Sequence, residues 1–144
     1  MWSKSEPIYR IATHATSKAW RERKSRYRLM GCECSKCGAV YFPVRFVCPA
    51  CYSREIKDRT FKGEGTITCM AIDYSPLMGH GEEVPKQLAA IKLDEGPTVV
   101  TDVVDCPPER LREGLRVEKV IRKWRRETNG NYMYGFKFRP SEED

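Results

Sequence analysis

The stretch "GCECSKCGAVYFPVRFVCPACYS", residues 31–53, decides the fold of the first part of the chain, because it holds five of the seven cysteines. Cys34 and Cys37 form one C-x-x-C pair, and Cys48 and Cys51 form a second pair after ten intervening residues. Two such pairs supply four thiolates to one tetrahedral metal, which is the arrangement of zinc ribbons. The spacing therefore predicts a metal site made of these four cysteines.

The predicted metal has a structural role. A catalytic zinc keeps one coordination position open, whereas here the protein fills all four. The metal would clamp about twenty residues, too few to bury a core unaided. Four thiolates also suit iron in a rubredoxin-like redox site, but nothing else in the chain resembles a rubredoxin, and zinc is favoured. Cys32 lies two residues before Cys34 and fits the knuckle poorly, so its role is open.

Around the cysteines, residues 39–42 and 45–47 can form a hairpin, with Pro43 near its tip. Gly38 allows the backbone to turn so that its amides point at sulfur. Cys69 and Cys106 lie in the later strand region, and they are interpreted as small buried hydrophobes or as free thiols.

Composition bounds the class of protein. The 144 residues carry a net charge of +6, with 32% charged and 40% hydrophobic residues. This balance permits nucleic acid, an anionic membrane or a phosphorylated ligand as partner, but it demands none of them. No apolar run is long enough to span a bilayer, and the N-terminus does not resemble a signal peptide. We therefore expect a cytoplasmic protein without a membrane partner, whose cysteines bind metal instead of forming disulfides.

The chain is predicted to be mainly β, with an N-terminal helical segment (1–30), a rubredoxin-like zinc ribbon (31–57), a five-stranded OB-fold barrel (58–140) and an acidic tail (141–144). The helix is expected over 13–28, which lacks Gly and Pro. Alternating apolar residues predict strands at 61–74, 88–94, 98–105, 115–127 and 132–138. Tyr132, Tyr134, Phe136 and Phe138 should share one face, and Asn129-Gly130 predicts a tight turn. A short helix at 109–112 before the fourth strand fits a Greek-key OB barrel.

The sequence contains no recognisable catalytic constellation. His14 and His80 stand outside any metal-binding or catalytic motif, and no nucleophile has an obvious base beside it. The G-E-G at 63–65 is interpreted as a bulge or kink in a barrel strand. The loop at 75–87 is long for a hairpin, and it either carries a function or is only a mobile tip.

The expected nucleic-acid face of an OB barrel lies on its second and third strands. Residues 88–105 contain no Phe, Tyr or Trp, and they carry one lysine against four acids, a net charge of −3. Single-stranded nucleic acid needs aromatic stacking and a basic groove. A single-stranded nucleic-acid-binding protein is therefore the alternative interpretation, and nucleic acid is not the expected partner.

The N-terminal helix offers a different surface. Trp20 and Tyr27 lie seven residues apart among several arginines, including Arg23 and Arg28. Trp, Tyr and Arg are enriched at the hot spots of protein interfaces. These four residues are predicted to bind a protein partner, although the helix could instead pack only on its own barrel.

Several motifs in a fixed order carry a family resemblance. They are Y-R-L-M-G at 27–31, C-x-x-C-G, F-P-x-R and C-P-x-C within the ribbon, G-E-G-T at 63–66 and L-D-E-G-P at 93–97. The chain resembles the zinc-ribbon/OB-fold proteins that accompany thiolases, an acyl-CoA-associated family long called a domain of unknown function. Val44, in place of a common second proline, and Cys32 depart from the family pattern.

The resemblance implies a non-catalytic subunit of an acyl-CoA enzyme complex. Similar archaeal proteins are scaffolds that bridge acetoacetyl-CoA thiolase and 3-hydroxy-3-methylglutaryl-CoA (HMG-CoA) synthase in the mevalonate (isoprenoid) pathway. They help to channel acetoacetyl-CoA along a shared coenzyme A site, so coenzyme A is expected at the interface with the partners. Similar domains in actinobacteria support thiolase-like aldolases or hydratases, so an accessory subunit of another thiolase-like acyl-CoA enzyme is the second alternative.

Overall fold

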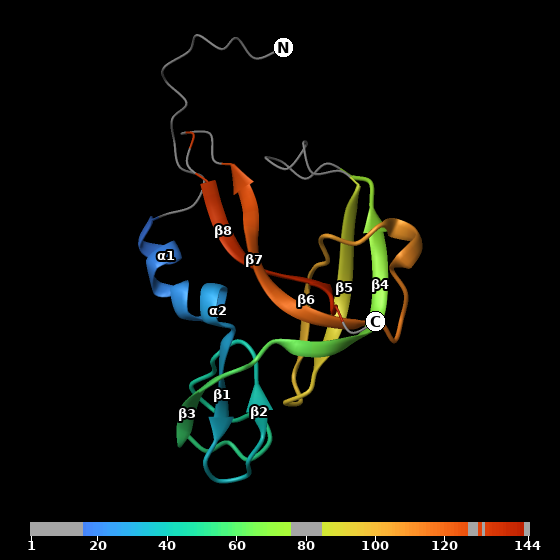
Figure 1. Cartoon of the computed structure of the whole chain (residues 1–144). Helices are drawn as coiled ribbons and strands as arrows, with labels where there is room; N and C mark the ends of the chain where they lie inside the picture. Colours follow the sequence, from blue (N-terminus) through green and yellow to red (C-terminus); the bar gives the residue numbers. More distant parts are fainter. Residues whose placement is uncertain (1–15, 76–84, 127–129, 131, 143–144) are drawn as a thin grey trace.

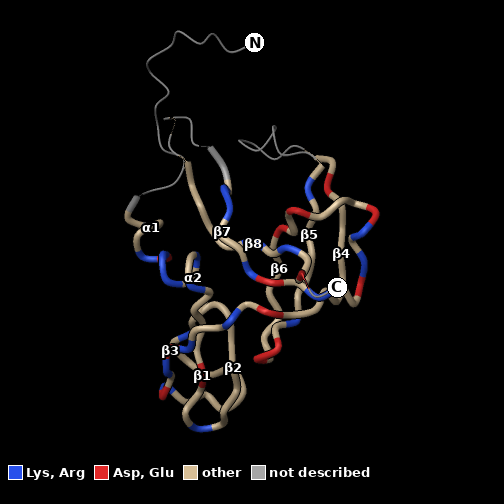
Figure 2. Tube along the Cα trace, in the orientation of Figure 1, with Lys and Arg blue, Asp and Glu red and all other residues tan. Residues whose placement is uncertain are grey.

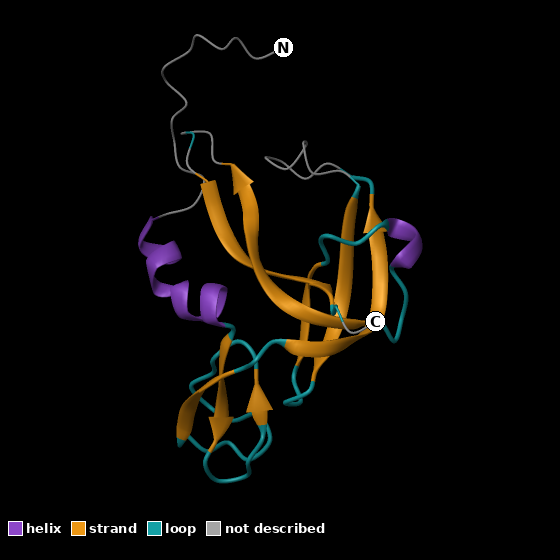
Figure 3. Ribbon diagram, in the orientation of Figure 1, coloured by secondary structure: helices purple, strands orange, loops and turns teal. Residues whose placement is uncertain are grey.

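The computed structural model describes residues 16–75, 85–126, 130 and 132–142. Two short helices, a three-stranded sheet and a five-stranded barrel follow one another along this part of the chain (Figures 1 and 3). The barrel is built from antiparallel neighbours in the order β6-β5-β4-β7-β8. The predicted fold class, a mainly β chain with helix, zinc ribbon and OB-type barrel, is confirmed.

The helical segment is two helices instead of the single one predicted over 13–28. Helix α1 covers Thr16–Arg21 and helix α2 covers Arg23–Arg28, with Glu22 between them at φ −86° and ψ 0°. Six-residue helices are too short to be stable alone, and α2 is held by contacts with β8 and β1. Leu29, fully buried and left-handed at φ 51°, ends α2 and donates its N–H to the carbonyl of Ser25. Residues 13–15 lie outside the described part.

The ribbon contains β1 (Met30–Cys34), β2 (Val40–Tyr41) and β3 (Ile56–Thr60), in the order β2-β1-β3. The predicted pairing of 39–42 with 45–47 is wrong, because Val40 and Tyr41 pair with β1 and 45–47 is not a strand. The cysteine spacing says nothing of β3, which returns after the second C-x-x-C and pairs with β1 along its whole length. The three-stranded sheet therefore extends to Thr60.

The barrel strands are β4 (Glu64–Asp73), β5 (Lys86–Leu93), β6 (Thr98–Asp102), β7 (Arg116–Arg126) and β8 (Tyr132–Pro140). They match the predicted strands within a few residues, and the predicted helix at 109–112 is a 3₁₀ turn, Pro108–Arg110. A bulge lies between Ile67 and Cys69 and not at 63–65. A parallel bridge between Val103 and Phe138 closes the barrel. Most of the loop at 75–87, together with His14, His80 and Asn129, lies outside the described residues.

The β7–β8 hairpin leaves the barrel after its first few residues. Strand β4 pairs with β7 only from Glu64 to Thr66, and beyond that point the hairpin runs past the barrel beside α2 (Figure 1). The alternating aromatic residues of β8 follow this path, since Phe138 is fully buried whereas Tyr132 and Tyr134 are about half exposed. Along the chain, this face of β8 thus begins at the surface with Tyr132 and ends in the core with Phe138.

The ribbon and the barrel share a core through one ring of the ribbon. Phe42 makes edge-to-face contacts with Phe61, with centroids 6.5 Å apart, and with Phe136 at 5.8 Å. Val40 and Phe42 pack against the buried cluster that includes Ile67 and Phe138. The two parts are therefore coupled mechanically through apolar packing as well as through the chain.

Candidate metal centre and partner surfaces

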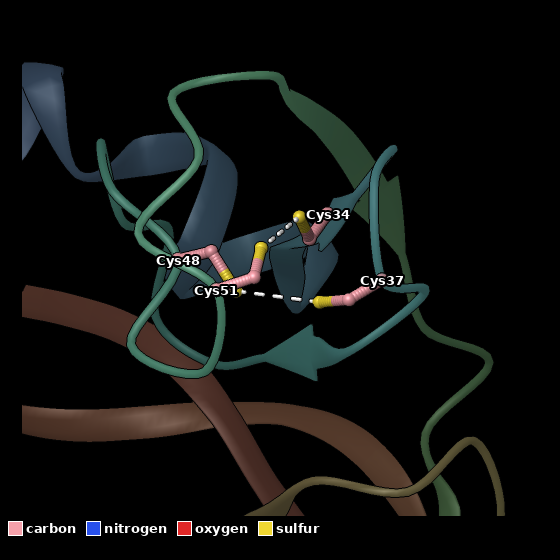
Figure 4. A group of neighbouring side chains, drawn as sticks. All are labelled: Cys34, Cys37, Cys48 and Cys51. Carbon is pink, nitrogen blue, oxygen red and sulfur yellow. Dashed lines mark hydrogen bonds between the residues drawn. The ribbon is translucent and has the colours of Figure 1, made fainter.

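The sulfur atoms of Cys34, Cys37, Cys48 and Cys51 all lie within 4.8 Å of one another. Two pairs, Cys34 with Cys51 and Cys37 with Cys48, are 3.5 Å apart (Figure 4). A zinc ion with Zn–S bonds of about 2.3 Å would place its tetrahedral sulfurs about 3.8 Å apart. The four cysteines predicted from spacing therefore fit zinc after shifts of their sulfurs of about 1 Å or less, and the closed ligand set fits a structural role.

Each C-x-x-C pair supplies backbone amides to its own sulfurs. Hydrogen bonding from the backbone N–H of Cys37, opposed by burial, holds the pKa of Cys34 below its ordinary value. Burial raises the pKa of Cys48, but the amides of Cys51 and Ala50 and the Tyr41 hydroxyl outweigh it and lower that pKa to about 6. The amides of Ala39 and Ser53 also lower the pKa values of Cys37 and Cys51, but burial and the neighbouring sulfurs outweigh them, so both pKa values are raised. Because zinc binds the deprotonated form, its binding would displace the protons of these two thiols.

The remaining cysteines do not join the metal group. Cys32 is fully buried in β1, and its sulfur accepts a hydrogen bond of 3.3 Å from the backbone N–H of Arg45. It thus holds the loop between the two cysteine pairs, a role that its position in the sequence did not reveal. Cys106 is buried, and burial raises the pKa of its thiol. Cys69 is exposed on β4 and is a free thiol, so its interpretation as a buried hydrophobe is wrong.

The helices carry a groove of about 540 Å³ that brings the predicted partner-binding residues together. Its lining residues are Ala19, Trp20, Arg23, Lys24, Tyr27 and Arg28. The Arg23 guanidinium lies over the Trp20 ring at 3.9 Å, and the exposed fractions are 66% for Trp20 and 44% for Tyr27. Arginine and lysine line the helices, and they also recur on β3, β7 and the barrel (Figure 2).

The barrel-facing side of α2 uses other residues. Arg26 stacks over Trp124 of β7 at 4.6 Å and forms an ion pair of 3.1 Å with Glu22. The helix therefore packs on the hairpin through Arg26, while Trp20 and Tyr27 keep large exposed surfaces. Helix α2 thus packs on its own hairpin, and Trp20 of α1 and Tyr27 of α2 are exposed, so their role in binding a partner stays a prediction.

A second exposed aromatic surface lies on the loops of the ribbon. Phe46 is 90% exposed and Tyr52 is 80% exposed, and Val44 and Val47, close to Phe46 in the chain, are also exposed. Tyr52 has a left-handed backbone, φ 58°, fixed by the hydrogen bond from its N–H to the carbonyl of Cys48. The sequence analysis did not predict the exposure of these side chains. The available signal was the number of apolar residues between and directly after the two metal-binding pairs, in a segment too small to bury them.

Among the described residues, the four cysteines form the single group of metal-binding side chains. No described helix has the length and hydropathy required to cross a membrane.

The fold and the metal centre define a zinc-ribbon/OB-fold protein. Two family models match it: a ChsH2 rubredoxin-like zinc ribbon domain over residues 21–57, and a ChsH2 C-terminal OB-fold domain over residues 58–122. A DUF35 domain-containing scaffold protein of Pyrococcus furiosus is 40% identical over 125 residues, covering 86% of this chain and 91% of the relative. A protein of the same name from Methanothermobacter thermautotrophicus is 37% identical, covering 87% and 96%. The chain belongs to this family of DUF35 domain-containing scaffold proteins.

More distant relatives share the fold. A Thermomonospora curvata protein named as a probable enoyl-CoA hydratase alpha subunit is 26% identical over 113 residues, covering 75% of this chain and 34% of the relative. A solved structure of the Ltp2-ChsH2(DUF35) aldolase matches with a TM-score of 0.66 at 23% identity, covering 85% of this chain and 89% of that one. At that identity the match shows the fold alone.

Proposed function

We propose that this protein is a non-catalytic, cytoplasmic scaffold that holds acetoacetyl-CoA thiolase and HMG-CoA synthase in one complex of the mevalonate pathway. Membership of a scaffold family supports the general role. The choice of enzymes rests on the family resemblance in the sequence. An accessory subunit of another thiolase-like acyl-CoA enzyme is the second candidate, supported by the relative named as an enoyl-CoA hydratase subunit.

The single observation that carries the proposal is the presence of two exposed aromatic surfaces on different elements. One is the helix groove with Trp20 and Tyr27, and the other is the ribbon loop surface with Phe46 and Tyr52. A scaffold that bridges two enzymes needs two separate contact surfaces. We assign one enzyme to each surface, because exposed aromatic anchors on a rigid support are the usual centres of protein interfaces.

The structural zinc and the shared core give this scaffold its stiffness. The ribbon loops are held by the four cysteines, and Phe42 ties the ribbon to the barrel through Phe61 and Phe136. Preorganised surfaces lose less conformational entropy when a partner binds. A stiff bridge can hold two active sites around one enclosed coenzyme A pocket, so that acetoacetyl-CoA passes from the thiolase to the synthase before it diffuses away.

The proposal is tested by reconstitution of the zinc-loaded chain with both enzymes, followed by size-exclusion chromatography. We expect co-elution of all three proteins and no acyl-CoA turnover by the chain alone. Trp20→Ala combined with Tyr27→Ala should weaken binding to one enzyme by about 2 kcal/mol or more, roughly 30-fold, which is the range for hot-spot loss. Phe46→Ala combined with Tyr52→Ala should weaken binding to the other enzyme.

The matched control is Tyr74→Ala, since Tyr74 is 70% exposed, lies just after the end of β4 and belongs to neither surface. It should leave both affinities unchanged. Equal co-elution of the two enzymes without this chain, or acyl-CoA turnover by the chain alone, would contradict the scaffold role. If both double variants weaken binding to the same enzyme and neither affects the other enzyme, the chain binds a partner but does not bridge two enzymes through these two surfaces.

A further inference from the structure

Positive charge is unevenly distributed along the chain. Residues 16–28, which form the two helices, contain six basic residues and one acid, so this segment carries a net charge of +5 out of +6 for the whole chain. The strands differ, because every strand arginine whose side chain the structure describes pairs with an acid. These pairs are Arg59 with Glu33, Arg116 with Asp94, Arg122 with Asp105 and Arg139 with Glu118. Most of the net charge of the chain therefore lies on the helices.

The wall of the helix groove contains basic groups and no acid. Its charged lining residues are Arg23, Lys24 and Arg28. Lys24 lies 3.7 Å from Asp58 of β3, and both side chains are more than half exposed. Within the described part of the chain, neither Arg23 nor Arg28 has an acidic partner. Glu22, the acid of the helical segment, is engaged on the barrel-facing side of α2. The groove thus holds two arginines whose charge no described carboxylate balances.

The groove also offers an apolar surface beside a fixed cation. Trp20 and Tyr27 are 66% and 44% exposed. The guanidinium of Arg23 lies 3.9 Å from the centroid of the Trp20 ring, and it donates a hydrogen bond of 2.8 Å to the Trp20 carbonyl. These two contacts hold the guanidinium beside the ring, and further N–H groups remain for a ligand, since a guanidinium has five donors. An arginine that is already held loses less conformational entropy when it binds a carboxylate.

These features together restrict the kind of ligand. A guanidinium binds a carboxylate through two parallel hydrogen bonds, and exposed Trp and Tyr side chains are common anchors in protein interfaces. Single-stranded nucleic acid also binds aromatic and basic residues, but it needs a groove that follows several nucleotides. Each helix here has six residues, so each is only about 9 Å long. A short acidic segment with an apolar side chain fits a groove of this length better.

We propose that the helix groove binds an acidic segment of a partner protein. An apolar side chain of that segment lies on Trp20 and Tyr27, and its carboxylates pair with Arg23 and Arg28. This inference rests on the proposed function, and it names the chemistry of the partner at one of the two surfaces. Charges at the rim of an interface act mainly on the association rate and lose their effect in salt. The partner is therefore attracted by charge and held by aromatic contact.

The test uses the zinc-loaded full chain with the acidic peptide EELFEE as the probe and the neutral peptide QQLFQQ as its matched control. Binding is followed by NMR through the indole N–H signal of Trp20. The indole signal of Trp124 is the internal reference, since Trp124 lies under Arg26 on the barrel-facing side of α2. For a ligand of this size we expect a dissociation constant on the order of 1 mM at low salt. QQLFQQ should bind about fivefold to tenfold more weakly, because exposed ion pairs are individually weak.

Salt and nucleic acid provide two further checks. Binding of EELFEE should decline between about 0.1 M and about 1 M salt, over which the Debye length falls from about 10 Å to about 3 Å. Equal binding of the two peptides, no binding of EELFEE up to its solubility limit, or a shift of the Trp124 signal without that of Trp20 overturns the proposal. Oligothymidylate of the same length is the third ligand, and tighter binding of it than of EELFEE at Trp20 would assign the groove to nucleic acid instead.

A pair of double variants separates the groove from the overall charge. Arg23→Gln combined with Arg28→Gln removes two positive charges from the groove and should weaken EELFEE about fivefold to tenfold. Arg54→Gln combined with Arg112→Gln is the matched control, since it removes the same charge from exposed arginines outside the groove. The control should leave binding unchanged. If it weakens binding as much as the groove variant does, the peptide responds to net charge alone and the proposal is refuted.

The groove variant also separates this inference from the proposed function. If EELFEE binds in the groove but neither thiolase nor HMG-CoA synthase associates with the chain, the chemistry of the groove stands and the choice of enzymes is wrong. If Trp20→Ala with Tyr27→Ala releases an enzyme whereas Arg23→Gln with Arg28→Gln releases none, the scaffold role stands and the acidic partner segment is refuted.

Discussion

Replacing Phe42 by alanine should destabilise the chain, because it removes the packing between the ribbon and the barrel. Phe42 makes two edge-to-face contacts across this junction, with Phe61 at 6.5 Å and with Phe136 at 5.8 Å. Each such pair contributes about 0.5–1.5 kcal/mol beyond its buried area, so the two contacts account for about 1–3 kcal/mol. The loss of apolar burial adds to this, but Phe42 is only partly buried, so the sum stays near the lower end of the range of about 3–5 kcal/mol for buried Phe→Ala. We expect Phe42→Ala to lower the free energy of unfolding by about 2–4 kcal/mol.

The assay is urea denaturation with zinc in excess, so that metal loss does not contribute. The wild-type chain should unfold in one transition, because the ribbon and the barrel share a core. Phe46→Ala is the matched control, since it is the same substitution in the same ribbon at a residue that is 90% exposed. It should change the free energy of unfolding by less than about 0.5 kcal/mol.

A double-mutant cycle isolates the ring contact from the general effect of a smaller side chain. Phe42→Leu and Phe136→Leu should show a coupling energy of about 0.5–1.5 kcal/mol, as for other edge-to-face pairs. If Phe42→Ala matches Phe46→Ala, and the cycle shows no coupling, then the ribbon and the barrel do not share a core.

Further predictions concern the metal, an ion pair and nucleic acid. Cys37→Ser should lose zinc, whereas Cys69→Ser should keep about one zinc per chain by elemental analysis; zinc retained by Cys37→Ser would contradict the assigned ligand set. Arg116 forms a two-contact ion pair with Asp94, at 2.8 and 2.9 Å, and lowers the pKa of that carboxyl. The contribution of this ion pair to stability is therefore present above the pKa of Asp94 in the unfolded chain. It disappears as the pH falls through the lower pKa that Asp94 has in the folded chain. Because both side chains are about half exposed, Asp94→Asn should lower the free energy of unfolding by less than about 1 kcal/mol at neutral pH. The check is urea denaturation at several pH values, and a stability difference between variant and wild type that is the same at every pH would refute this linkage. Any binding to single-stranded nucleic acid should be weak and lost with added salt; submicromolar binding at physiological salt, measured by fluorescence anisotropy, would favour the nucleic-acid alternative.

The cysteine pairs and the strand pattern could be predicted from the sequence because both depend on local spacing. Two C-x-x-C pairs identify their own ligands, since each knuckle closes within four residues. Likewise, residues that alternate along a strand, such as Phe136 and Phe138, share a face in any sheet. These local rules were sufficient for the grouping of the four cysteines and for the barrel strands.

Only the tertiary structure decided how these pieces meet. Strand β3 pairs with β1 across the metal loops, and β2 pairs with β1 instead of with 45–47, because strand partners are chosen by contacts between distant residues. The position of Phe42 between ribbon and barrel follows from the same contacts, as does the exposure of Phe46 four residues later. Asp102 lies between Lys86 and Lys137 because three strands bring together charges that are far apart in the sequence. Local periodicity predicts on which face of a strand a side chain lies, but it does not predict which other element packs against that face.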